Sequence, residues 1–194
     1  SIENLIKNIN KDIGNLDFIV HALAYSDKEE LKGKYVETSR QNFLSTLDIS
    51  TYSFTRISKS ASKIMINGGS LLTLTYVGSN KTTPNYNVMG VAKAALETSV
   101  KYLSVDLGKN NIRVNAISAG PMKTIAGAAI SGARHVYRYS EKIAPLQKNP
   151  DLEQVGNAAL YLLSDISSGV TGLTHYVDGG LKIVGIPNQD IISI

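Results

Sequence analysis

The sequence predicts an α/β fold of the Rossmann-like kind, in which a doubly wound, mostly parallel sheet is covered by helices. Short apolar runs suited to buried strands alternate along the chain with longer segments of helical period, an order typical of parallel sheets. The chain has 194 residues, of which 43% are hydrophobic and 19% charged. That length and composition suit one globular domain with a sizeable core. We therefore expect a single domain over residues 1–194.

The first elements are a helix and a strand. Apolar residues recur at helical spacing over Ser1–Ile13, and Gly14 ends this helix. Leu16–Leu23 is a nearly continuous apolar run, the pattern of a parallel strand that is covered on both faces. Helical signals then extend from Thr38 to Ile66, and the side chains expected in the core there are Phe43, Leu44, Leu47, Phe54, Ile57 and Ile64.

The centre of the chain is a strand, a loop and a helix. Ser70–Tyr76 is rich in apolar and β-prone residues and predicts a buried strand. A polar loop with Pro84 follows. From about Asn85 the apolar residues repeat at three and four, and Gly108 stands where a helix C-terminal cap belongs.

The last third alternates in the same way. Ile112–Ser118 and Thr174–Val177 predict strands, and a turn at Asp178–Gly180 follows the second of them. Ile183–Ile194 predicts an apolar tail that packs on a neighbouring subunit or on the chain's own surface. Asp151–Asp165 predicts a helix with Asp151 as N-cap, and its inward side chains are expected to be Leu152, Val155, Ala159, Leu160 and Leu163.

Composition excludes several classes of protein. The net charge is +4 and the pI near 9.1, but the charges are scattered and do not form a nucleic-acid pattern. The absence of cysteine excludes disulfides, thiolate catalysis and cysteine zinc sites, and fits a cytoplasmic protein. No apolar run reaches the roughly 18 residues of a membrane-spanning helix. We expect no metal, because the three histidines, His21, His135 and His175, have no ligand-like spacing.

The residues that indicate chemistry are Tyr76, Tyr86 and Lys93. Tyr86 and Lys93 are seven residues apart, nearly two helical turns, so both leave the same face of the predicted helix. Tyr76 ends the strand that feeds the loop. Phenols can donate to an oxygen that gains negative charge, and a nearby ammonium favours that charge and the phenolate form. The alternative is that the tyrosines only pack and Lys93 extends to solvent.

Three stretches, Leu72–Lys93, Arg113–Pro121 and Val177–Gly180, resemble the bacterial NADH-dependent enoyl-acyl carrier protein reductases. These form a divergent branch of the short-chain dehydrogenase/reductase family. The specific mark is a Tyr-x6-Lys pattern, Tyr86 to Lys93, with a second tyrosine, Tyr76, ten residues upstream. Members that reduce carbonyls have Tyr-x3-Lys, and this chain has Met89 at that tyrosine's position.

The resemblance implies reduction of the double bond of a trans-2-enoyl thioester on acyl carrier protein, in fatty acid synthesis, with NADH as hydride donor. Tyr86 would donate a hydrogen bond to the thioester oxygen, Lys93 would hold the cofactor ribose, and Tyr76 would shape the acyl pocket or assist protonation. The cofactor would contact Leu23, Lys93, Gly120, Pro121, Met122, Thr124 and Ala126. The substrate would contact Ser26, Tyr76, Tyr86 and Met89.

Residues 121–150 form the substrate-binding loop region by the same resemblance. The segment has little strand pattern, and it carries five Lys or Arg against one acid, Glu141. Its basic residues are either a solvated surface or a docking patch for the acidic carrier protein. The resemblance further implies a cytoplasmic homotetramer that binds neither nucleic acid nor membrane. His21, at the end of the first strand, is expected to be structural.

The family's Gly-rich pyrophosphate turn and first strands have no counterpart in this sequence. We therefore expect residues 1–194 to be the C-terminal two-thirds of one dinucleotide-binding reductase domain. Two alternatives stay open, a carbonyl-reducing short-chain dehydrogenase and a non-catalytic remnant that only binds partners.

Overall fold

The computed structural model of the chain describes residues 2–124 and 131–187. Its centre is a parallel sheet of four strands, β1 (Phe18–His21), β2 (Gly69–Thr75), β3 (Ile112–Ala119) and β4 (Thr174–Val177), in the order β1-β2-β3-β4. This confirms the predicted α/β class. All strands run the same way, so their carboxyl ends meet at one edge of the sheet, where ligands of open α/β sheets bind.

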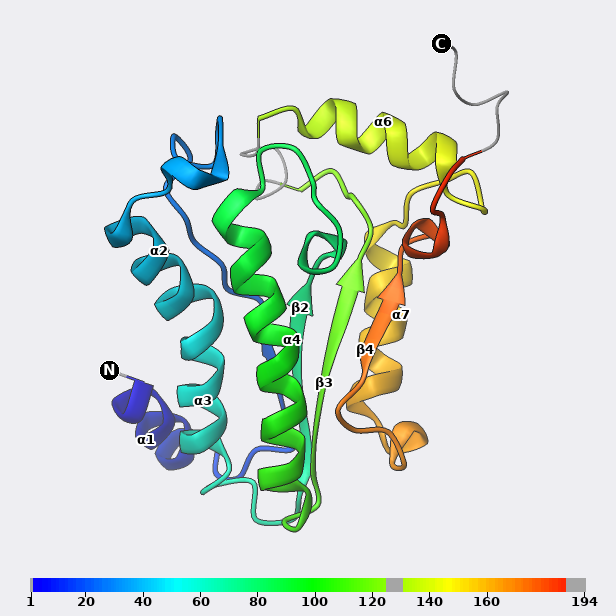
Figure 1. Cartoon of the computed structure of the whole chain (residues 1–194). Helices are drawn as coiled ribbons and strands as arrows, with labels where there is room; N and C mark the ends of the chain where they lie inside the picture. The colour runs from blue at the N-terminus through cyan, green and yellow to red at the C-terminus, as the bar shows by residue number, and fades with distance from the viewer. Residues whose placement is uncertain (1, 125–130, 188–194) are drawn as a thin grey trace.

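Helices form a layer on each face (Figure 1). On one face lie α1 (Ile2–Asp12), α2 (Arg40–Leu47), α3 (Ser53–Ala61) and α4 (Asn87–Gly108), and on the other lies α7 (Leu152–Leu163). The helix α6 (Ala133–Ile143) lies across the carboxyl ends of β3 and β4 (Figure 1). Short helical turns occupy Tyr35–Glu37 (η1), Val77–Ser79 (η3), Asp165–Ser167 (η4) and Leu181–Ile183 (η5).

The core follows the two-residue alternation of the strands. Leu71 of β2 and Val114 of β3 pack with Leu96 and Val100 of α4, whereas Leu72 and its neighbours face the other way. The cluster under α7 consists of Leu72, Ile117, Ala119, Val155 and Leu162. Each helix layer therefore holds one face of the central strands, which fixes where their carboxyl ends lie.

The strand β1 differs from its prediction. It is at one edge of the described sheet, and β2 is its neighbour there. Ile19 packs into the core, but Phe18 and Val20 on the opposite face are 53% and 46% exposed. The expectation that both faces are covered is wrong for the described residues, because α7 packs on β2, β3 and β4.

The long helical segment predicted from Thr38 to Ile66 is two helices joined by a π-helical turn, Asp48–Tyr52 (η2). Leu44, expected in the core, is 50% exposed. In α7, Asp151 forms a capping box with Gln154, which confirms it as the N-cap. Leu152 and Leu160 nevertheless point to solvent. Leu160 is two residues, about 200° around the helix, from the buried Leu162.

Two further predictions are corrected. Gly108 is the last residue of α4 and is followed by Lys109 in a right-handed conformation, so the left-handed residue lies later, at Asn111, with φ 58°. The segment expected to be irregular contains α6. Ala133, Val136, Tyr137 and Ile143 recur at helical spacing on the side of the buried Ser140, so the sequence did carry a helical pattern, which the many charged and polar residues between them obscured. None of the helices in the described part is long and apolar enough to cross a membrane.

Candidate active site

The candidate site begins where β2 ends. Tyr76 follows β2 in extended conformation, and η3 comes next. The ring of Tyr76 meets that of Tyr86 edge-on, with centroids 5.1 Å apart and an interplanar angle of 66°. Gly78 allows this approach, because a Cβ there would lie 2.5 Å from Cδ1 of Tyr86. The structure thus brings the two predicted tyrosines together.

Tyr86 is the residue just before α4 and is 7% exposed. It packs with Leu31, Val88, Met89 and Ala92. Met89 therefore lies beside the tyrosine pair, a position that the predicted contact with substrate requires. Burial, then the charges of Tyr76 and Glu97, raise the pKa of Tyr86 above its ordinary value. The phenol is therefore a neutral donor. Desolvation thus acts against the phenolate form that a nearby ammonium is expected to favour.

Lys93 is buried, with 7% exposure, and its Nζ donates to the carbonyl oxygen of Leu74 at 2.8 Å. The alternative in which Lys93 extends to solvent is therefore wrong. Burial lowers the pKa of Lys93 to about 8, and the negative charge of Glu97 partly offsets that effect. Lys93 is thus a buried cation at neutral pH, and the carbonyl that it contacts belongs to Leu74, two residues before Tyr76 along the chain.

His21 ends β1 and is 3% exposed. Its Nε2 lies 2.8 Å from the Ser53 hydroxyl, its Nδ1 lies 3.0 Å from the Thr73 hydroxyl, and its ring contacts Phe54. Ser53 Oγ donates to the Ile49 carbonyl, so it accepts from His21. Burial, then the Lys93 charge, lowers the pKa of His21 to about 4. A buried ring with a hydroxyl within hydrogen-bond distance of each nitrogen agrees with the predicted structural role.

The chain after β1 places the next two predicted residues differently. Leu23 is 54% exposed at the sheet edge. Ser26 is buried, and its hydroxyl bonds to the side chains of Asn42 and Thr46 on α2. Ser26 therefore anchors the loop after β1 to α2.

The predicted cofactor residues after β3 continue from its carboxyl end. Gly120 donates to the Val177 carbonyl at 2.8 Å and packs so tightly that a Cβ would meet Pro150 at 2.8 Å. Pro121 and Thr124 are half-buried, and Met122 packs against the core cluster under α7. Ala126 lies outside the described residues. The segment leaves β3 at the sheet edge that Tyr76 also occupies.

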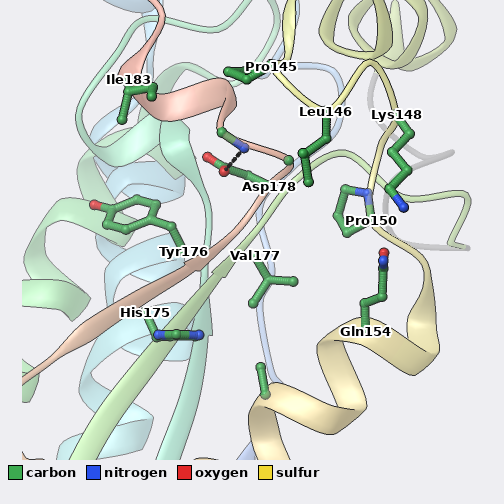
Figure 2. Close-up of a pocket in the computed structure, with 13 residues that line it drawn as sticks. Pro145, Leu146, Lys148, Pro150, Gln154, His175, Tyr176, Val177, Asp178 and Ile183 are labelled. Carbon is green, nitrogen blue, oxygen red and sulfur yellow. Dashed lines mark hydrogen bonds between the residues drawn. The ribbon is translucent and has the colours of Figure 1, made fainter.

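A separate hollow of about 540 Å³ lies beside β4 and the turn after it, between α7 and residues 145–150 (Figure 2). Its apolar lining includes Pro145, Leu146, Pro150 and Val177. The carboxylate of Asp178 accepts from the backbone of Gly180 and Lys182 and so holds the turn after β4. Neither Tyr76, Tyr86 nor Lys93 lines this hollow, so we place the chemistry at the tyrosine pair.

Glu97 is a residue of the site that sequence reasoning missed. It lies one turn after Lys93 on α4, and Thr75, Ser79 and Asn80 donate to its carboxylate. The signal that could have found it is its i+4 spacing from Lys93, which places both on one helix face.

Comparison with known proteins identifies the family. A family model described as enoyl-(acyl carrier protein) reductase matches residues 1–182. The chain belongs to this family. It is 55% identical over 194 residues to enoyl-[acyl-carrier-protein] reductase [NADH] 1 of Rhizobium meliloti, a match that covers all of the chain and 71% of the relative. Over 181 residues it is 49% identical to the [NADPH] enzyme of Staphylococcus aureus, covering 93% of the chain and 71% of that protein.

The fold agrees with solved members of the family. The structure of the reductase of Anaplasma phagocytophilum in complex with NAD has 55% identity and a TM-score of 0.93, covering 97% of this chain and 72% of that one. The resemblance drawn from the Tyr-x6-Lys pattern is thereby confirmed at the level of family and fold.

Proposed function

We propose that this protein reduces the double bond of trans-2-enoyl thioesters carried by acyl carrier protein, with NADH, in fatty acid synthesis. The observation that carries the proposal is the buried, neutral Tyr86 packed against Tyr76 on the helix that also buries Lys93. The names of its relatives support the same activity.

The residues present fit a nicotinamide dinucleotide. The Lys93 ammonium has three N–H donors, and the described residues use one of them, toward Leu74. Burying an ammonium is unfavourable unless its donors are satisfied, so the remaining two suit hydroxyl acceptors such as those of a ribose. Gly120, Pro121, Met122 and Thr124 would border the nicotinamide half, with Leu23 and Ala126. When bound, NADH supplies the hydride that the β carbon of the substrate receives.

Tyr86 would stabilise the charge that forms on the thioester oxygen. Among the described residues no hydrogen bond joins the Tyr86 hydroxyl to another side chain or carbonyl, so its proton is available to a substrate oxygen. Loss of one such donor typically raises the barrier by roughly 3–4 kcal/mol. Because burial keeps the phenol protonated, it acts as a hydrogen-bond donor throughout the neutral pH range.

Tyr76 and Met89 would shape the acyl pocket together with Ser26. Tyr76 is less buried than Tyr86, and burial raises its pKa as well, which the hydrogen bond to Thr83 partly offsets. A protonated Tyr76 beside the reacting oxygen would also suit assistance to protonation.

The carrier protein would dock on α6. Arg134, Arg138 and Lys142 are exposed and recur every four residues, so they share one face of that helix. In the described part of the chain none of the three has an ion pair, so their charge is available to an acidic partner. We also infer a cytoplasmic homotetramer, and exposed apolar side chains such as Tyr102, Val105 and Leu160 support association.

A substrate comparison tests the proposed function. The protein, as its gene encodes it, is given NADH and either a crotonyl thioester or a 3-oxoacyl thioester, and NADH consumption is followed by absorbance. We expect turnover of the crotonyl thioester alone. Turnover of the 3-oxo substrate instead would identify a carbonyl-reducing dehydrogenase, and failure to bind NADH would identify a non-catalytic binding protein.

A further inference from the structure

Glu97 is tied to both ends of the segment that carries Tyr76. Thr75, the last residue of β2, donates to Glu97 Oε1 at 2.8 Å. Ser79, the last residue of η3, donates to the same oxygen at 2.5 Å, and Asn80 donates to Oε2 at 3.2 Å. One carboxylate on α4 therefore fixes the backbone immediately before and shortly after Tyr76, at the sheet edge where the tyrosine pair lies.

The same carboxylate acts on Lys93 through space. In the described residues no ion pair joins the two, and the Lys93 ammonium donates to the Leu74 carbonyl. The negative charge of Glu97 nevertheless opposes the effect of burial on Lys93. Hydroxyl and amide donors hold the carboxylate in place, so its distance from Lys93 is set by structure rather than by a flexible side chain.

The other titratable groups around Lys93 cannot take over this role. From β1, His21 is coupled to Lys93, but it is neutral above a pKa of about 4. Tyr76 and Tyr86 stay protonated, since burial raises the pKa of both phenols. Within the described residues, Glu97 is therefore the group among these whose negative charge acts on Lys93.

We propose that Glu97 is a positioning residue of the site, which holds the Tyr76 segment against α4 and supplies the charge that keeps the buried Lys93 ammonium protonated. Its effect on turnover rests on the proposed function. Its effect on the ionisation of Lys93 does not.

The test uses Glu97→Gln in the protein as its gene encodes it. Glutamine keeps an oxygen that can accept from Thr75 and Ser79 but removes the charge. The titration of Lys93 is followed by NMR of lysine labelled at the ε carbon and Nζ, with the signal assigned by its loss in Lys93→Met. We expect Lys93 in Glu97→Gln to titrate at lower pH than in the wild type, and the alkaline limb of kcat/KM for NADH to move to lower pH with it.

Two further variants separate charge from anchoring. Ser79→Ala removes one anchor and keeps the charge, so Lys93 should titrate as in the wild type. Glu97→Asp keeps the charge, so its Lys93 titration should lie closer to the wild type than that of Glu97→Gln, and this comparison remains available if Glu97→Gln folds poorly.

An unchanged Lys93 titration in folded Glu97→Gln would overturn the proposal, as would equal shifts in Glu97→Gln and Ser79→Ala, which would reduce Glu97 to an anchor. If Lys93 shifts as expected but wild-type protein does not reduce enoyl thioesters, the proposed function fails and the assignment of Glu97 stands.

Discussion

The start of α4 and the outer edge of β1 are both built from apolar and aromatic residues, yet they differ in how they are covered. At the start of α4, Tyr86 and Met89 are each 7% exposed. On β1, His21 is buried, while Phe18 and Val20 on the opposite face are about half exposed. An apolar sequence pattern therefore predicts that a strand suits a buried position. Whether its side chains are in fact buried depends on the helices and strands that pack against them.

The largest expected effect concerns the β1 edge. If residues 1–194 are expressed by themselves, we expect poor solubility or partial folding and no NADH binding, because in the described residues β1 pairs with β2 alone and exposes Phe18 and Val20. Size-exclusion chromatography, thermal unfolding and NADH fluorescence measure this. A monodisperse, cooperatively unfolding and active preparation would show that the exposed edge of β1 does not limit folding or NADH binding.

The next effect is at Lys93. Lys93→Met keeps helix propensity but removes the ammonium donors, so NADH affinity should fall roughly 10- to 100-fold, the range for losing a hydrogen bond to a charged group. Fluorescence titration gives the Kd. Lys101→Met is the matched control, since Lys101 is an exposed lysine of the same helix. Equal affinities in both variants would show that burial of Lys93 serves the fold alone.

A smaller effect links stability to the buried end of β1. The pKa of His21 is about 4 in the folded state against 6.5 as its ordinary value. The unfolded chain thus binds the extra proton first, and the contribution of His21 to stability is complete above pH 6.5 and is lost as pH falls toward 4. At about 1.4 kcal/mol per pKa unit, the ceiling is about 3 kcal/mol, and solvent screening lowers it.

Thermal unfolding between pH 7 and 4 measures this loss of stability. His21→Gln, which keeps a donor toward Ser53 without titrating, should flatten the pH dependence, and the exposed His135→Gln should not. A pH profile that is the same in His21→Gln and the wild type would contradict the linkage.

The smallest effect lies on α6. Neutralising Arg134, Arg138 and Lys142 together should raise KM for carrier-bound substrate several-fold, and less at high salt, because exposed charges are screened. Steady-state kinetics with the carrier-bound substrate and with a small thioester analogue distinguish docking from structure. A matching loss with both substrates would make the patch structural.

The sequence was sufficient for the order of the strands, for the helices other than α6 and for the tyrosine pair, because strand alternation and helical spacing are local properties. It was insufficient for Leu44, Leu152 and Leu160, since their exposure depends on which neighbours reach them. The π-helical turn at Asp48–Tyr52 left no periodic mark. The i+4 spacing from Lys93 could have pointed to Glu97, but its hydrogen-bond partners on β2 and η3 cannot be read from spacing along α4. The neutral state of Tyr86 depends on desolvation, which spacing cannot give.

The most direct test of the central claim compares two phenols in one assay. Tyr86→Phe and Tyr76→Phe each remove one hydroxyl and keep the ring, and kcat is measured with a crotonyl thioester alongside the Kd of NADH. The account predicts a fall in kcat of roughly 100- to 1000-fold for Tyr86→Phe with little change in Kd, and a smaller fall for Tyr76→Phe. A wild-type kcat in Tyr86→Phe, or a larger loss in Tyr76→Phe, would contradict the assignment of Tyr86 as the donor to the thioester oxygen.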